Sequence, residues 1–242
     1  RIYLDYAATT PVAPEVEKAM RSYQTKIFGN PGSVHWFGQE ASAAVFKARQ
    51  TVARALNCSY EEIVFTGSAT EANNLAIRGV INMATSDVHP AKAGAPTAVG
   101  IDAILGTSDV KPKLIVSAIE HESILETARD LEREGAEVVY LPVNQDGLVD
   151  LKKLKAAIDE RTVLVSIQYA NSEIGVIQPI RDIVSIVKGP ASAQSSSRLR
   201  PASKALAGKQ MSNVLIHTDA VQALQFLDCD VEKLGVDMMT FS

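Results

Sequence analysis

The stretch VLIHTDAVQ, from Val214 to Gln222, holds the residues of this chain that could do the most specific chemistry. Its apolar start predicts a buried strand that delivers Asp219 and Gln222 to the end of a sheet. Because burying an unpaired charge is costly, Asp219 needs a partner, and a protonated pyridine nitrogen would be one. Gln222 would supply an amide donor to a ring oxygen. The alternative on this stretch alone is that Asp219 caps a following helix.

A second polar cluster, TGSATEANN from Thr66 to Asn74, is predicted to follow a strand and to open a helix. Free backbone N–H groups and the helix dipole at such a position favour an anion, and Ser68 and Thr70 add hydroxyl donors. The cluster therefore predicts a phosphate cradle. The alternative is that Ser or Thr only caps the helix, which is the commoner role.

Two further clusters follow predicted strands. His121 comes after the strand 114–117, and Asn171 and Ser172 come after the strand 163–167. Ligands of open α/β sheets bind beyond the carboxyl ends of strands, so an imidazole there could stack on a ring and move protons. The alternatives are an exposed loop histidine and an ordinary Asn-rich turn.

The elements that must position these side chains alternate between strands and helices, which predicts an α/β fold: a mainly parallel sheet flanked by helices. Continuous apolar runs typical of strands buried on both faces occur at 63–66, 114–117, 138–141, 163–167, 214–216 and 236–241. Helical spacing of apolar residues occurs at 39–56, 71–83, 123–134, 151–158 and 180–187. Asp150 is the expected N-cap of the helix at 151–158.

Composition excludes several classes of protein. The net charge of -4 gives no electrostatic argument for binding nucleic acid or an anionic membrane, and no apolar run approaches the length of a membrane span. The scattered histidines indicate no metal site. Two cysteines, Cys58 and Cys229, indicate reduced thiols and a cytoplasmic protein. Stretches 86–112 and 189–212 interrupt the strand–helix rhythm and are predicted to be surface insertions.

Taken in order, these motifs resemble the cysteine desulfurase family of class V aminotransferase-like enzymes, which have fold type I. The resemblance covers nearly the whole chain except the two insertions. The motifs that carry it are YLDYAATTP at 3–11, FGNP at 28–31, FTGSATE at 65–71, Glu120-His121, NSEIG at 171–175, HTDAVQ at 217–222 and DMMTFS at 237–242.

The resemblance implies pyridoxal 5′-phosphate (PLP) as cofactor. It assigns the phosphate to Ala69 and Thr70, with a hydroxyl from Ser242, and the ring nitrogen to Asp219, which would make the ring an electron sink. His121 would stack on the ring and assist proton transfers. The remaining expected contacts to the ring oxygen come from Gln222 and from Asn171 or Ser172.

The chain also departs from the family. Many members carry Asn-Asn where this chain has Asn171-Ser172, which replaces the usual contacting amide by a hydroxyl. The family's Schiff-base Lys, its small C-terminal domain and its nucleophilic Cys lie beyond the position of Ser242. The resemblance thus implies a segment at 1–20, an incomplete PLP-binding large domain at 21–242, and an isolated piece that is inactive.

By resemblance, the complete protein would convert L-cysteine to L-alanine and pass the sulfur to an enzyme cysteine as a persulfide, for iron–sulfur cluster or thio-cofactor assembly. Expected partners are a second copy of the chain and a sulfur-acceptor or iron–sulfur scaffold protein. The alternatives are a selenocysteine lyase, another class V PLP enzyme, and a non-catalytic fragment or scaffold in sulfur transfer. A nucleotide-binding domain is disfavoured, because neither a Gly-x-Gly-x-x-Gly nor a Walker motif is present.

Overall fold

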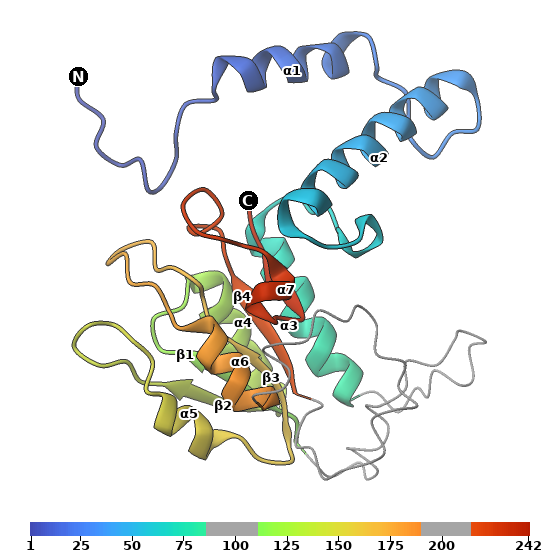
Figure 1. The fold of residues 1–242 in the computed structure, drawn as a ribbon. Coiled ribbons are helices and arrows are strands. Elements are labelled where there is room, and N and C mark those ends of the chain that lie inside the picture. Colours follow the sequence, from blue (N-terminus) through green and yellow to red (C-terminus); the bar gives the residue numbers. More distant parts are fainter. Residues whose placement is uncertain (86–110, 190–213) are drawn as a thin grey trace, which may run out of the picture. The chain divides into compact units, whose positions relative to one another are not determined.

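A parallel sheet organises the second part of the chain (Figure 1). It has five strands in the order β2-β1-β3-β4-β5, and every neighbouring pair is parallel. The strands are β1 (Lys113–Ser117), β2 (Glu137–Leu141), β3 (Thr162–Ser166), β4 (Leu215–Asp219) and β5 (Met238–Thr240). The predicted fold class, a mainly parallel sheet flanked by helices, is confirmed.

The computed structural model describes residues 1–85, 111–189 and 214–242. Apart from their edges, the predicted insertions at 86–112 and 189–212 lie outside these ranges. The described residues form two units, Arg1–Val64 and Phe65–Ser242. The domain boundaries expected from the sequence, 1–20 and 21–242, stay a prediction.

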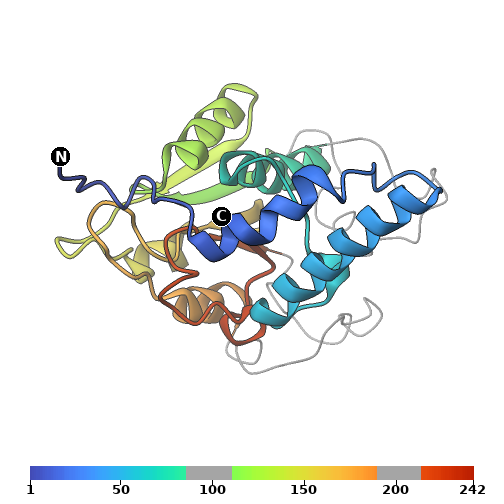
Figure 2. The same ribbon diagram turned by 90° about the horizontal axis from the view of Figure 1, so that it is seen from above.

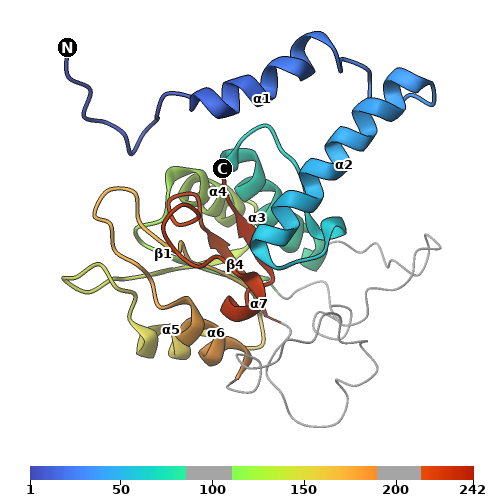
Figure 3. The same cartoon turned by 45° about the horizontal axis from the view of Figure 1, so that its top comes forward.

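Helices cover both faces of the sheet (Figure 3). One face carries α3 (Ala69–Thr85) and α4 (Glu122–Arg133), and the other carries α5 (Leu151–Ala157), α6 (Ile180–Lys188) and α7 (Val231–Leu234). In α4, Ile124, Ala128 and Leu131 recur on one helical face and are fully buried or nearly so, which explains why this segment docks as a helix. Asp150 caps α5 as expected, because its Oδ1 accepts the Lys152 and Lys153 N–H groups.

The strand predicted at 63–66 is wrong. This segment is extended but has no strand partner in the part of the chain that the structure describes. Ile63 is 5% exposed while Val64 is 67% exposed. A short β-branched run has the same composition in a strand and in an extended connection, so its pattern alone does not supply the neighbouring backbone that a strand requires.

The first unit is helical, with α1 (Pro14–Thr25), α2 (Trp36–Leu56) and the short 3₁₀ helix η1 (Tyr60–Glu62) (Figure 2). The sequence patterns did not predict α1, and none of its residues is buried. Val16, Met20 and Tyr23 lie on one helical face at i, i+4 and i+7, and each is about half exposed. This α1 stripe is an apolar surface of the kind that packs against another part of a protein or another chain.

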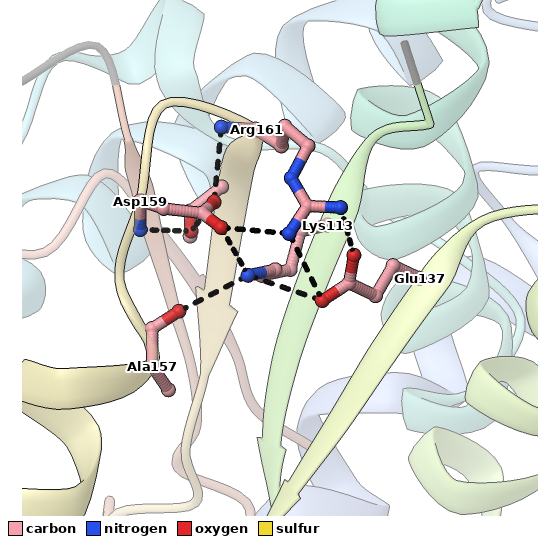
Figure 4. A network of polar contacts seen from close by, with 6 residues as sticks. Lys113, Glu137, Ala157, Asp159 and Arg161 are labelled. Atoms are coloured by element: carbon pink, nitrogen blue, oxygen red, sulfur yellow. Dashed lines mark hydrogen bonds and ion pairs between the residues drawn. The ribbon is translucent and has the colours of Figure 1, made fainter.

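A cluster of charges lies where β1, β2 and β3 begin (Figure 4). The Lys113 ammonium contacts Asp159 at 2.5 Å and Glu137 at 3.1 Å, and Arg161 pairs with both carboxylates. Burial alone would lower the pKa of Lys113, but its hydrogen bonds to Asp159 and Glu137 outweigh burial and raise it. Burial would raise the pKa of Asp159, and Lys113 and Arg161 together hold it well below its usual range.

The lengths of the described helices and the placement of possible metal ligands both bear on function. None of their helices is long and apolar enough to cross a membrane. No group of three or more His, Cys, Asp or Glu side chains among them is placed to hold a metal ion. Neither Cys58 nor Cys229 forms a disulfide with another described residue, and burial raises the pKa of Cys229.

Candidate functional site

The strand order places a topological switch point between β1 and β3. The chain runs from β1 to β2 on one side and then crosses to β3 on the other side, so the connections leave these two strands in opposite directions. Ligands of such sheets bind beyond the carboxyl ends of the strands at this point. The loops after β1, β3, β4 and β5 all start at this edge, and they carry most of the residues that the sequence singled out.

Asp219 ends β4 and is 8% exposed. Its Oδ1 accepts the Val221 N–H at 3.0 Å, and its Oδ2 accepts Asn73 Nδ2 at 2.8 Å. The residue therefore caps a turn, whereas the helix that the alternative interpretation expected after it is not formed: residues 221–226 are turns. Within the described ranges, however, no Lys, Arg or His forms an ion pair with it. A buried carboxylate served only by neutral donors suits a cationic ring nitrogen.

The first turn of α3 retains free donors. The Ser68 Oγ accepts the Glu71 N–H at 3.1 Å, and a Glu71 carboxylate oxygen accepts the Gly67 N–H at 2.6 Å. The N–H groups of Ala69 and Thr70 have no acceptor among the described residues, and the Thr70 side chain is exposed. Ser68 therefore caps the helix, while the donors beside it stay available to a phosphate.

His121 is exposed and forms the N-cap of α4. Its Nδ1 accepts the Ser123 N–H at 3.1 Å and lies 2.8 Å from the Ser123 Oγ. A ring nitrogen that accepts a backbone N–H carries no proton of its own, so the neutral imidazole is protonated on Nε2. The atom able to exchange protons with a ligand is therefore Nε2.

Asn171 and Ser172 differ in what they leave free. The Asn171 Nδ2 donates to the Ile119 carbonyl at 3.0 Å, and its Oδ1 accepts the Glu173 and Ile174 N–H groups, both at 2.9 Å. Asn171 thereby ties the loop after β3 to the loop after β1. Ser172 is exposed beside it. Of the two, Ser172 has the side chain less committed to the protein.

Gln222 and Ser242 lie near the same edge of the sheet. Gln222 is half-buried in the turn that follows Asp219. Thr240 pairs with Asp219 across β4 and β5, and Ser242 is two residues further along the chain, exposed. Their expected contacts to a ligand stay a prediction.

Glu120 belongs to this edge too, although it was not among the predicted site residues. It is 5% exposed, both of its carboxylate oxygens lie 3.0 Å from the Gln168 N–H, and it also binds the Ser117 hydroxyl. Burial raises the pKa of Glu120 to about 8, against the hydrogen bonds from Ser117 and Gln168 that lower it, and the charge of Asp219 raises it further. Glu120 is therefore largely protonated at neutral pH.

Replacing Glu120 by Gln should remove a pH dependence of stability. The folded pKa of about 8 exceeds that of an unfolded glutamate, about 4.3. Wild-type Glu120 thus contributes stability that is fully present below about pH 4.3 and is lost as the pH rises through about 8. The Glu120→Gln variant keeps the shape and cannot ionise. Urea unfolding of both proteins between about pH 5 and about pH 8 should show wild type losing stability relative to the variant.

Parallel stability curves for wild type and Glu120→Gln over that range would contradict the assignment of a protonated Glu120. Glu173→Gln is the matched control, because Glu173 is exposed in the nearby loop after β3. Its stability should follow that of wild type at every pH, since this side chain lies in water in the folded protein as it does in the unfolded chain.

His217 has a structural place two residues before Asp219. It is fully buried, with Nδ1 at 2.8 Å from the Ser166 Oγ and Nε2 at 3.0 Å from the Thr240 Oγ1. Burial lowers the pKa of His217 to about 4, so the ring is neutral at physiological pH. It joins β3, β4 and β5 beneath the site and supplies no charge to it.

Comparison with known proteins decides the family. The sequence model of class V aminotransferases matches residues 2–90 and 97–193. This chain belongs to the class V aminotransferase family. The protein called cysteine desulfurase IscS in Dechloromonas aromatica is 40% identical over 242 residues, a match that covers 99% of this chain and 49% of that protein.

Solved structures of similar class V proteins agree. A NifS-like protein superposes with a TM-score of 0.79 and 33% identity, covering 100% of this chain and 55% of that one. A structure described as SspA in complex with cysteine superposes with a TM-score of 0.77 and 32% identity, covering 99% of this chain and 56% of that one. The chain spans about half the length of the curated relatives that it matches.

Class V aminotransferases and cysteine desulfurases are PLP-dependent, and the described residues fit that cofactor. The free N–H groups of Ala69 and Thr70 suit its phosphate, and the buried, cation-free Asp219 suits its ring nitrogen. The Asn73 amide brings the first turns of α3 to Asp219, so both features belong to one edge of the sheet.

Two residues of the candidate site, Glu120 and Asn73, were not predicted from the sequence. Glu120 had a signal, because a carboxylate three residues after a buried strand must be neutralised or paired. Asn73 had none, because an Asn one turn into a helix is usually exposed; here it is 1% exposed. Its partner Asp219 is 146 residues away.

Proposed function

We propose that the whole protein to which this chain belongs is a PLP-dependent cysteine desulfurase. It takes the sulfur of L-cysteine, leaves L-alanine, and passes the sulfur to a cysteine thiol of the enzyme as a persulfide. The observation that carries the proposal is the 40% identity to a relative called cysteine desulfurase over 99% of this chain. The similar structure described as a complex with cysteine supports the same substrate.

The donors at the start of α3 bind the cofactor in this proposal. The Ala69 and Thr70 N–H groups and the Thr70 hydroxyl hold the phosphate, and Ser242 adds a second hydroxyl to it. Asp219 holds the ring nitrogen protonated. PLP supplies an electron sink for the carbon next to the substrate amine.

The remaining side chains orient the ring and move protons. His121 stacks on the ring and exchanges protons through Nε2, the nitrogen that its helix cap leaves free. Gln222 donates to the ring oxygen. Ser172 is the better candidate for the neighbouring contact, because the Asn171 amide already binds Ile119 and its own loop.

A second copy of the chain is the expected structural partner. The α1 stripe, Val16, Met20 and Tyr23, supports this, because a soluble helix with an uncovered apolar face needs a surface to pack against. A sulfur-acceptor or iron–sulfur scaffold protein completes the proposal, as does a role in cluster or thio-cofactor assembly. The cytoplasmic location expected from the sequence stays a prediction.

Alanine formation tests the function directly. The purified whole protein, supplied with PLP, L-cysteine and a reducing thiol, should release alanine and sulfide in equal amounts. Selenocysteine, whose C–Se bond is weaker than C–S, should also release alanine, so the deciding result is that cysteine itself is converted. A protein that uses selenocysteine only would be a lyase of that substrate, and one that uses neither would contradict the proposal.

A further inference from the structure

A chain of hydrogen bonds links three elements at the carboxyl edge of the sheet. Asn73, in the second turn of α3, is 1% exposed. Its Nδ2 donates to the Asp219 Oδ2 of β4 at 2.8 Å and to the Ser123 Oγ of α4 at 3.0 Å. The Ser123 Oγ in turn lies 2.8 Å from the His121 Nδ1. The Asn73 amide is thus connected both to Asp219 and, through Ser123, to His121, the two side chains expected to contact the cofactor ring.

The direction of these bonds is fixed. A side-chain amide has two hydrogens on its nitrogen, and Asn73 uses one for each partner. Its Oδ1 is buried and has no partner among the described residues. Turning the amide over would set this oxygen against the Asp219 carboxylate, which is worse than leaving the oxygen unpaired. The amide orientation is therefore the one that an ionised Asp219 demands.

The same orientation acts on His121. Because Ser123 receives a hydrogen from Asn73, its own hydroxyl hydrogen is free to point to the His121 Nδ1. That nitrogen then accepts two hydrogen bonds, one from the hydroxyl and one from the Ser123 backbone. The proton of the neutral ring is kept on Nε2, and the ring is held in one orientation.

We propose that Asn73 is a positioning residue that couples Asp219 to His121, with Ser123 as the link. The inference rests on the proposed function and deepens it: the carboxylate that binds the ring nitrogen and the imidazole that moves protons are set by one amide. Asn73 touches neither cofactor nor substrate. It fixes the charge and direction of Asp219 and the proton-bearing nitrogen of His121 together.

Three variants of the whole protein test the coupling. Asn73→Leu removes both donors at similar volume, and Asn73→Asp replaces the donors by acceptors. Ser123→Ala removes the hydroxyl between Asn73 and His121 and leaves the Asn73 bond to Asp219 in place. The dissociation constant of PLP is measured by adding it to cofactor-free protein and following its visible absorbance. The values of kcat and KM for cysteine are measured on the loaded protein.

Asn73→Leu and Asn73→Asp should weaken PLP binding by about tenfold or more, because each loses a hydrogen bond to a charged group. Ser123→Ala should leave PLP binding within about twofold and lower kcat about tenfold with little change in KM, because His121 loses the hydroxyl donor to Nδ1 and keeps only the backbone one. Asn82→Leu, on an exposed part of the same helix, is the matched control and should behave as wild type.

The outcomes separate this inference from the function on which it rests. A wild type that binds PLP while both Asn73 variants bind it equally well would overturn the coupling alone. An unchanged kcat and an unchanged pH profile in Ser123→Ala would remove the His121 arm, even if the Asn73 variants fold poorly. A wild type that binds no PLP would overturn the proposed function and this coupling with it.

Discussion

Asp219→Asn in the whole protein should lower the rate of alanine formation from cysteine by at least about a hundredfold. The substitution removes the negative charge that holds the ring nitrogen protonated, and with it the electron-withdrawing power of the cofactor. The side chain keeps its size, so the turn bond to Val221 is retained. The measurement is the initial rate at saturating PLP and cysteine.

The local response to Asp219→Asn follows from Asn73. An amide at position 219 presents hydrogens to the Asn73 Nδ2, so Asn73 should turn over and offer its otherwise unpartnered Oδ1. Folding should therefore survive while the chemistry fails. Asp146→Asn, at an exposed turn residue after β2, is the control and should leave the rate unchanged. A rate near that of wild type in Asp219→Asn would show that Asp219 does not serve the ring nitrogen.

The second large effect should come from the charge cluster of Lys113, Glu137, Asp159 and Arg161, which lies at the amino ends of β1, β2 and β3. Asp159→Asn should lower the free energy of unfolding by about 2–4 kcal/mol at neutral pH, because it strips a charge partner from the buried Lys113 ammonium. Lys113 keeps its contact to Glu137, which is why the loss stays below that of an isolated buried charge. Urea or thermal unfolding would measure it.

The effect of Asp159→Asn should also depend on pH. Since the folded pKa of Asp159 is depressed, its contribution is present above the unfolded value of about 3.9 and is lost as the pH falls below it. Wild type and variant should thus converge in acid. Asp228→Asn is the matched control: its ion pair with Lys233 is exposed, so its loss should change the free energy of unfolding far less than Asp159→Asn does. Equal losses in the two variants would contradict the argument from burial.

Local patterns were sufficient for most of the sheet and its helices. Continuous apolar runs predicted all five strands, although only β1 and β3 are buried along their whole length, while the edge strands β2 and β5 are partly buried. The apolar spacing within α4 and α6 predicted their buried faces. The segment 63–66 was predicted wrongly, because an extended connection and a strand share the same residues. The helix α1 was not predicted, and none of its residues is buried among the described residues.

The site was predictable to a lesser depth. Strand ends and helix starts are visible in sequence, so Asp219, His121 and Thr70 were found as members of one edge. The contacts that orient these side chains were not predicted. Asn73 is 50 residues from Ser123 and 146 residues from Asp219 in the sequence, and only the fold brings them to hydrogen-bond distance. Sequence patterns report which side chains reach the edge, and not which of them meet there.

The place of α3 also matters while the chain is being made. This helix lies against β3, β4 and β5, yet it precedes all of them in the sequence. Asp219 leaves the ribosome 146 residues after its partner Asn73, a delay of roughly 7–30 s at about 5–20 residues per second. During that interval Ile77, Val80 and Ile81 gain their cover in steps, first from β1 and α4 and then from β3. The sheet is therefore completed in order: β1, β2 and β3 can pair before β4 and β5 add to them, and the Asn73 contact to Asp219 forms only after β4.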